Sequence, residues 1–137
     1  MKNLFTYGTL MFSDVIHRIV HKKYPGQPAV VKGFKRTQII GDVYPVAIPQ
    51  NGACVEGVIY LNVNQKDCLR LDAFEGEYYQ RIKTQAFESA KSEHPLFTCE
   101  LYVLKAKYYK LASKKHWNPE AFSKNFIQSF TKRYPTR

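Results

Sequence analysis

The feature that most constrains this chain is the stretch Leu4-Phe5-Thr6-Tyr7-Gly8-Thr9-Leu10 near its N-terminus. Its first four residues have the β-branched and aromatic bias of a buried strand. Gly8 is expected to end the strand, because glycine lets the backbone turn sharply or lets another group approach it closely. A helix capped by Ser13 or Asp14 is expected next. Its apolar face would consist of Val15, Ile16, Ile19 and Val20.

A strand, a glycine turn and a helix start bring several backbone N–H groups near one point. The first N–H groups of a helix have no partner within it, so such a point can seat a carboxylate. The alternative is a plain connection between a strand and a helix with nothing bound. From this stretch alone, the plain connection is favoured.

The composition predicts one globular domain over residues 1–137, with 45% hydrophobic and 23% charged residues. No apolar run is long enough to cross a bilayer, and the N-terminus has no signal-peptide pattern, so a cytoplasmic protein is expected. Cys54, Cys68 and Cys99 have no metal-ligand spacing and are expected as reduced thiols. The sequence suggests no metal and no redox cofactor.

The formal net charge of +10 raises the expectation of an anionic partner. The basic residues are dispersed as pairs such as Lys22-Lys23 and Lys132-Arg133, and no nucleic-acid motif is present. The charge is therefore interpreted mainly as solvated surface, with steering of an acidic substrate as the lesser alternative.

Hydrophobic periodicity predicts a mixed α+β protein with a curled or barrel-like sheet. A loop is expected at 24–28 and a turn at Gln50-Asn51-Gly52, because both are rich in turn residues. Strands are expected at 29–40 with a bulge at Gly33, at 43–49, 54–63, 78–87 and 97–104. One helix is expected from Asn64 or Gln65 to Glu75 and a closing helix after Asn118.

Two groups of side chains are candidates for chemistry. His17 and His21 are four residues apart on one helix, a spacing that zinc can use, but no third ligand is evident and a solvated pair is favoured. Glu75 lies four residues after Leu71, which is expected on the inner side of its helix together with Leu69. Burial there would raise the pKa of Glu75 and suit it to proton transfer near neutral pH.

The alternative for Glu75 is a surface acid, or an acid paired with Arg81, and the two interpretations are held equal. Asp72 and Glu77 are expected to be more exposed.

These segments together resemble the γ-glutamylcyclotransferase-like family. The resemblance is to its AIG2-like and γ-glutamylamine cyclotransferase branch. The motifs, from Met1 to about Leu104, are Tyr7-Gly8-Thr9-Leu10, Gly41-Asp42-Val43-Tyr44-Pro45-Val46-Ala47, Val55-Glu56-Gly57-Val58-Ile59-Tyr60 and Leu71-Asp72-Ala73-Phe74-Glu75-Gly76, followed by Tyr79 and Arg81.

The resemblance implies a small mixed β-barrel with flanking helices. It implies that Tyr7, Gly8, Thr9 and Leu10 bind a small γ-glutamyl substrate, largely through backbone groups that hold its α-carboxylate. Glu75 would accept and donate the proton in a cyclisation to 5-oxoproline that releases an amine. No cofactor is implied.

Two other classes of function stay open beside this enzyme. One is a non-catalytic small-molecule binding module with the same fold. The other is a basic protein that binds nucleic acid or an acidic partner, which only the net charge supports. The sequence does not specify an oligomeric state or which γ-glutamyl compound would be the substrate.

Overall fold

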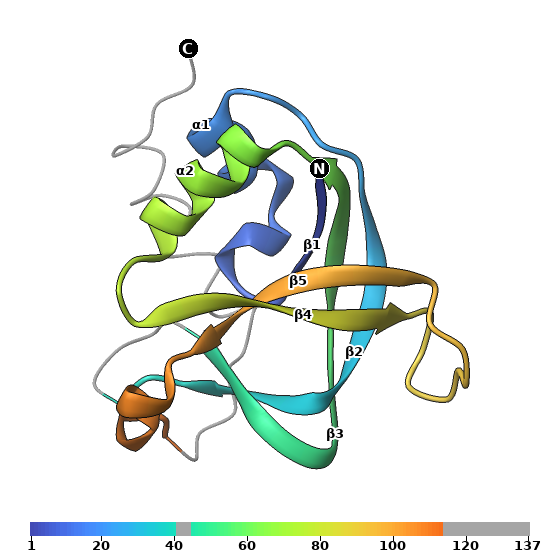
Figure 1. Ribbon diagram of the computed structural model, residues 1–137, viewed down its shortest axis with the longest axis vertical. Helices are drawn as coiled ribbons and strands as arrows, with labels where there is room; N and C mark the ends of the chain where they lie inside the picture. Colours follow the sequence, from blue (N-terminus) through green and yellow to red (C-terminus); the bar gives the residue numbers. More distant parts are fainter. Residues whose placement is uncertain (41–44, 114–137) are drawn as a thin grey trace.

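The computed structural model describes residues 1–40 and 45–113. Five strands, two α-helices and two short 3-10 helices follow one another in this part of the chain (Figure 1). In chain order they are β1 (Lys2–Thr6), η1 (Thr9–Met11), α1 (Ser13–Val20), β2 (Gly26–Gln38), β3 (Pro45–Val63), α2 (Gln65–Glu75), β4 (Tyr79–Phe87), β5 (Phe97–Leu104) and η2 (Ala106–Leu111).

The strands form a closed barrel in the order β1-β3-β2-β4-β5. All neighbouring pairs are antiparallel except β1 and β5, which are parallel, with Leu4 opposite Glu100. Closure leaves no unpaired sheet edge between first and last strand. The α+β barrel with flanking helices expected from the sequence is therefore confirmed.

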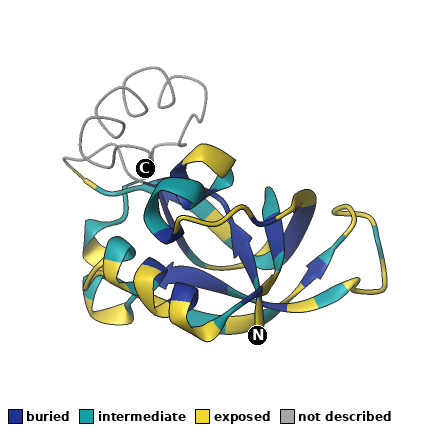
Figure 2. Ribbon diagram, turned by 90° about the horizontal axis from the view of Figure 1, so that it is seen from above, coloured by how far each residue is buried: buried dark blue, intermediate teal, exposed yellow. Residues whose placement is uncertain are grey.

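Strand alternation divides the apolar residues into two layers, because successive side chains of a strand point to opposite faces. Leu4 faces the helices and packs with residues of α1 and α2, including Ile16 and Leu71. Phe5 faces the barrel interior and packs with Ile59 and other inward residues. Figure 2 shows buried residues along the strands and exposed residues along the outer side of the helices. One apolar layer therefore lies between the barrel and the helices α1 and α2, and the other fills the barrel interior.

The ribbon of β2 and β3 contains the irregularity expected at Gly33, whose φ is +86°. The register changes there: Lys32 lies opposite Cys54, and Phe34 lies opposite Pro49. The turn expected at 50–52 does not break β3, because these residues are absorbed as extra length opposite this bulge. The loop expected at 24–28 is shorter in the structure than predicted. Strand β2 already begins at Gly26, which pairs with Tyr60.

Helix α1 has the expected position but not the expected cap. Its N-cap is Phe12, without a side-chain cap hydrogen bond, and Ser13 and Asp14 lie inside the first turn. Phe12 is the one extended residue between η1 and α1, so it takes the N-cap position and Ser13 begins the helix.

Helix α2 begins as expected, with the Asn64 side chain accepting a hydrogen bond from the Asp67 amide at 2.7 Å. Its buried residues include Cys68 and Leu71. Leu69, expected on the inner side, is 58% exposed. Helical geometry explains the correction, because consecutive residues lie about 100° apart and Cys68 and Leu71 define the buried face.

The closing helix expected after Asn118 lies outside the described residues. Within the described ranges, none of the helices combines the length and apolar character that a membrane span requires.

Candidate active site

The turn after β1 is held by the side chain of Tyr7. Tyr7 is buried, its hydroxyl donates to the Tyr102 carbonyl oxygen at 2.5 Å, and the Ala47 amide donates to the same hydroxyl at 3.1 Å. The Tyr7 carbonyl oxygen accepts a hydrogen bond from the Arg36 guanidinium at 2.9 Å. The Tyr7 hydroxyl therefore joins β1, β3 and β5 and is already engaged as both donor and acceptor.

Gly8 is needed because the chain passes close to Pro45. A Cβ atom at Gly8 would lie 2.6 Å from the Pro45 Cγ atom, which is too close without a shift of one of them. Pro45 is in turn held by Tyr79, whose hydroxyl donates to the Pro45 carbonyl oxygen at 2.7 Å. Residues from the turn, from the start of β3 and from the start of β4 therefore meet at this place.

Thr9 and Leu10 are both buried. The Leu10 side chain belongs to the apolar layer beneath the helices, and its carbonyl oxygen accepts a hydrogen bond from the Tyr60 hydroxyl at 2.9 Å. The side chains of Tyr7 and Leu10 are therefore both engaged in contacts within the fold.

Glu75 is the last residue of α2 and is followed by Gly76, whose φ of +88° ends the helix. The residue is half-buried. Burial raises the pKa of the Glu75 carboxyl to about 8, with a further contribution from the negative charge of Asp72. This is the environment that the inward position of Glu75 predicted.

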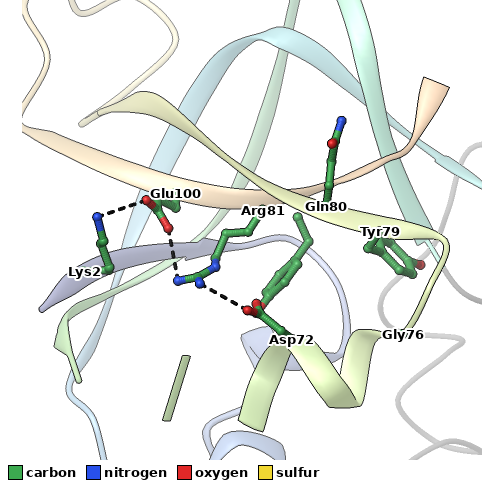
Figure 3. Close-up of a pocket in the computed structure, with 8 residues that line it drawn as sticks. Lys2, Asp72, Gly76, Tyr79, Gln80, Arg81 and Glu100 are labelled. Atoms are coloured by element: carbon green, nitrogen blue, oxygen red, sulfur yellow. Dashed lines mark hydrogen bonds and ion pairs between the residues drawn. The ribbon is translucent and has the colours of Figure 1, made fainter. Parts of the chain in front are cut away.

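Asp72 is more enclosed than expected and is held by two partners. The Tyr102 hydroxyl donates to one carboxylate oxygen at 2.6 Å. The Arg81 guanidinium donates to the other at 3.1 Å (Figure 3). Arg81 also pairs with Glu100 at 3.1 Å. The pairing of Arg81 with Glu75 that was considered from the sequence is not the one that forms, because Arg81 is shared between Asp72 and Glu100.

Glu75 and the Tyr7 turn lie within electrostatic reach of each other. The pKa of Tyr7 is raised by burial first, and then by the charges of Tyr79 and Glu75. The pKa of Tyr102 is also raised, by burial, by its hydrogen bond to Asp72 and by the charges of Asp72 and Glu75. Tyr102 links the turn after β1 to α2, because its carbonyl oxygen accepts from the Tyr7 hydroxyl and its own hydroxyl donates to Asp72, one helical turn before Glu75.

Tyr102 is the residue of this site that the sequence did not suggest. It lies in the apolar run Leu101-Tyr102-Val103-Leu104, where a tyrosine is indistinguishable from an ordinary packing residue. Only the barrel places its carbonyl oxygen beside Tyr7 and its hydroxyl beside Asp72.

A depression of about 580 Å³ opens beside this network. Its lining includes Asp72, Gly76, Tyr79 and Arg81, so it adjoins both the end of α2 and the start of β4 (Figure 3). Its lining is polar and carries charges of both signs, but it includes neither Glu75 nor any residue of the turn Tyr7-Gly8-Thr9-Leu10.

In the ranges 1–40 and 45–113, no three His, Cys, Asp or Glu side chains are arranged to hold a metal ion. His17 is half-buried and His21 is exposed. All three cysteines are free thiols, with Cys68 and Cys99 buried and Cys54 exposed.

The fold is a small closed barrel, and its candidate site has a carboxyl of raised pKa at the end of a helix. The family model "Gamma-glutamyl cyclotransferase, AIG2-like" matches residues 4–119. AIG2-like protein A of Arabidopsis thaliana is 27% identical over 136 residues, which are 96% of this chain and 81% of that protein.

Solved structures agree with this match. A solution structure of an Arabidopsis thaliana protein has a TM-score of 0.70 at 25% identity, covering 97% of this chain and 87% of that one. A structure titled gamma-glutamyl cyclotransferase has a TM-score of 0.64 at 18% identity, covering 99% and 88%, and shares the fold. The chain belongs to the AIG2-like γ-glutamyl cyclotransferase family.

Proposed function

We propose that this protein cyclises a γ-glutamyl compound to 5-oxoproline and releases the attached amine, with Glu75 as the proton acceptor and donor. The observation that carries the proposal is the half-buried position of Glu75 at the end of α2, one helical turn after Asp72, where burial raises the pKa of its carboxyl to about 8. Membership of the family supports the same reaction class. The compound is a γ-glutamyl-amine or a γ-glutamyl amino acid.

The first step is the loss of a proton from the α-ammonium of the γ-glutamyl group, because an ammonium has no lone pair to attack with. Glu75 takes this proton in its ionised form. The amine nitrogen then forms a bond to the γ-carbonyl carbon and gives a tetrahedral intermediate. Since nucleophile and electrophile belong to one molecule, the protein mainly has to hold the substrate in a folded, reactive conformation.

The second step breaks the bond between the γ-carbon and the departing nitrogen. An amide nitrogen leaves poorly as an anion, so it must be protonated as the bond breaks. Glu75 returns the proton that it accepted, and the carboxyl ends in its starting form. The attacking nitrogen loses its second proton as the lactam forms, and this proton goes to the released amine, which departs as an ammonium. A carboxyl with a pKa of about 8 suits both transfers, because its proton affinity is close to that of an amine.

The turn Tyr7-Gly8-Thr9-Leu10 would hold the substrate α-carboxylate. The packing of the Tyr7 and Leu10 side chains leaves backbone groups for this contact. Valine in place of Gly8 would place its Cβ atom 2.6 Å from the Pro45 Cγ atom, which should narrow the turn and weaken substrate binding. When the turn of the parent protein holds the α-carboxylate, the substrate would lie with its γ-carbonyl toward Glu75.

The test is release of 5-oxoproline from a panel of γ-glutamyl-amines and γ-glutamyl dipeptides. The parent protein is compared with Glu75→Gln, and with Glu77→Gln as a matched control, since Glu77 is exposed two residues further on. We expect Glu75→Gln to abolish turnover and Glu77→Gln to retain it. Full activity in Glu75→Gln would remove Glu75 from this role.

A parent protein that releases no 5-oxoproline from any member would refute the proposed reaction. Calorimetric titration of the same panel would then show whether the fold serves as a binding module.

A further inference from the structure

Asp72 lies one helical turn before Glu75, at a spacing that brings the two side chains onto neighbouring positions of the same helix face. Two acids at this spacing repel each other when both are charged. The structure nevertheless supports a charge on Asp72, through the hydroxyl of Tyr102 and the guanidinium of Arg81. Two neighbouring carboxyl groups are thereby placed in different environments.

The charge of Asp72 is only partly balanced. Arg81 divides its guanidinium between Asp72 and Glu100, and Glu100 also pairs with Lys2 at 3.4 Å. Groups around Glu75 come from every element packed near it. They are Asp72 on α2, Tyr7 on the turn after β1 and Tyr102 on β5, and the charges next to Asp72 are Arg81 on β4 and, through Arg81, Glu100 on β5.

We propose that Asp72 is a positioning residue for the proposed reaction. Its carboxylate, fixed between the Tyr102 hydroxyl and the Arg81 guanidinium, makes Glu75 a stronger proton acceptor. This inference rests on the function proposed above and adds a second acid to it. Asp72 does not exchange a proton with the substrate but acts through Glu75.

The chemical reason is a match of proton affinities. An ordinary glutamate is too weak a base to deprotonate an ammonium efficiently, because the ideal catalytic group has a pKa close to that of its partner. Burial and a neighbouring negative charge both raise the pKa of a carboxyl, because each disfavours its ionised form. A fixed negative charge one turn away adds to the proton affinity without further enclosing Glu75.

Tyr102 connects the turn after β1 to Asp72. Its carbonyl oxygen accepts from the Tyr7 hydroxyl at 2.5 Å, and its own hydroxyl donates to Asp72 at 2.6 Å. One residue of β5 therefore sets both the turn that would hold the substrate and the acid that would tune the base. Strand β5 therefore fixes the position of the Tyr7 turn relative to Asp72.

The chain contains a closely matched control on the same helix. Asp67 is buried, accepts a hydrogen bond from the Tyr24 hydroxyl at 2.5 Å, and pairs with Arg70 at 3.3 Å. Like Asp72, it is an aspartate of α2 held by one tyrosine and one arginine. It lies two turns before Glu75, beyond the reach of a helical neighbour.

The experiment compares the parent with Asp72→Asn and Asp67→Asn. The titration of the Glu75 carboxyl is followed by ¹³C NMR, with its signal assigned from its loss in Glu75→Gln. The pH dependence of kcat/KM for 5-oxoproline release is measured in parallel. We expect Asp72→Asn to lower the Glu75 midpoint, and the acidic limb of kcat/KM with it, by about one pH unit or less. We expect Asp67→Asn to leave both unchanged.

An unchanged midpoint in Asp72→Asn would overturn the inference, as would an equal lowering in Asp67→Asn. Tyr102→Phe provides a second variant that keeps the Asp72 charge, should Asp72→Asn fail to fold. Its midpoint should stay at or above that of the parent. A lowered midpoint in Tyr102→Phe would show that packing, and not the charge of Asp72, sets the proton affinity.

The two readouts separate this inference from the proposed function. The NMR titration needs no substrate, so it tests the effect of Asp72 on Glu75 even in a protein without turnover. A protein with turnover whose pH profile ignores Asp72 would retain the proposed function and lose the inference.

Discussion

Replacing Glu75 by glutamine should change the pH dependence of folding stability as well as the activity. The folded protein holds the Glu75 pKa at about 8, above the ordinary value of 4.5 that applies in the unfolded chain. Between these two values, the folded state keeps a proton that the unfolded state has lost. Raising the pH therefore favours unfolding over this window, and the parent protein should lose stability as the pH rises from about 4.5 to about 8.

The size of the effect follows from the two pKa values. Each unit of difference corresponds to about 1.36 kcal/mol, so the full difference corresponds to about 5 kcal/mol. Glu75 is half-buried, and solvent that reaches the carboxylate reduces this figure, so we expect about 2–5 kcal/mol. Glutamine cannot ionise, so the Glu75→Gln variant should lack this contribution at every pH.

Urea unfolding of both proteins at pH 4.5, 6, 7 and 9 measures the effect. The free energy of unfolding of Glu75→Gln minus that of the parent should grow with pH up to about 8 and then level off. Any constant cost of the substitution cancels in this comparison, and Glu77→Gln controls for the loss of one carboxylate. Parallel pH profiles for Glu75→Gln and the parent would refute the argument that the fold holds this carboxyl in its protonated form.

Two further substitutions test the hydrogen bonds of the Tyr7 hydroxyl and the packing of β1 on β3. Tyr7→Phe should lower the free energy of unfolding by about 1–3 kcal/mol in urea titrations, because Ala47 and Tyr102 lose a buried hydrogen-bond partner; a neutral result would mean that water replaces the hydroxyl. Gly57→Ala should cost about 1–3 kcal/mol or more in thermal unfolding, since its Cβ would lie 2.1 Å from the Thr6 carbonyl oxygen. An unaltered melting temperature would contradict the close packing of β1 on β3.

Much of the barrel could be predicted from local pattern. The strand at 97–104 and the helix ending at Glu75 have the expected bounds, because alternation and a glycine stop are local signals. The expectations that failed concern features decided by pairing. The turn at 50–52 became part of β3, because residues 50–53 form an extra length of β3 opposite the single residue Gly33 of β2. Leu69 points outward because contacts with the barrel select the buried face of α2.

The same division holds for the candidate site. The inward position of Glu75 follows from its spacing to Leu71, and burial does raise its pKa. The sequence does not identify the acid that pairs with Arg81, because different folds could place Asp72, Glu75 or Glu100 beside it. The barrel decides it by pairing β4 with β5, which places Lys83 opposite Glu100 and Arg81 opposite Tyr102.

The sequence by itself therefore determined the kind of protein, the strand that leads to the Tyr7 turn and the acid at the end of α2. These depend on residue type and on spacing along one segment. The tertiary structure alone decided that Tyr102 connects Tyr7 to Asp72 and that Asp72 carries a supported charge beside Glu75. The physical reason is that electrostatic interactions depend on distance through space, and the closed barrel brings these residues together from three separate parts of the chain.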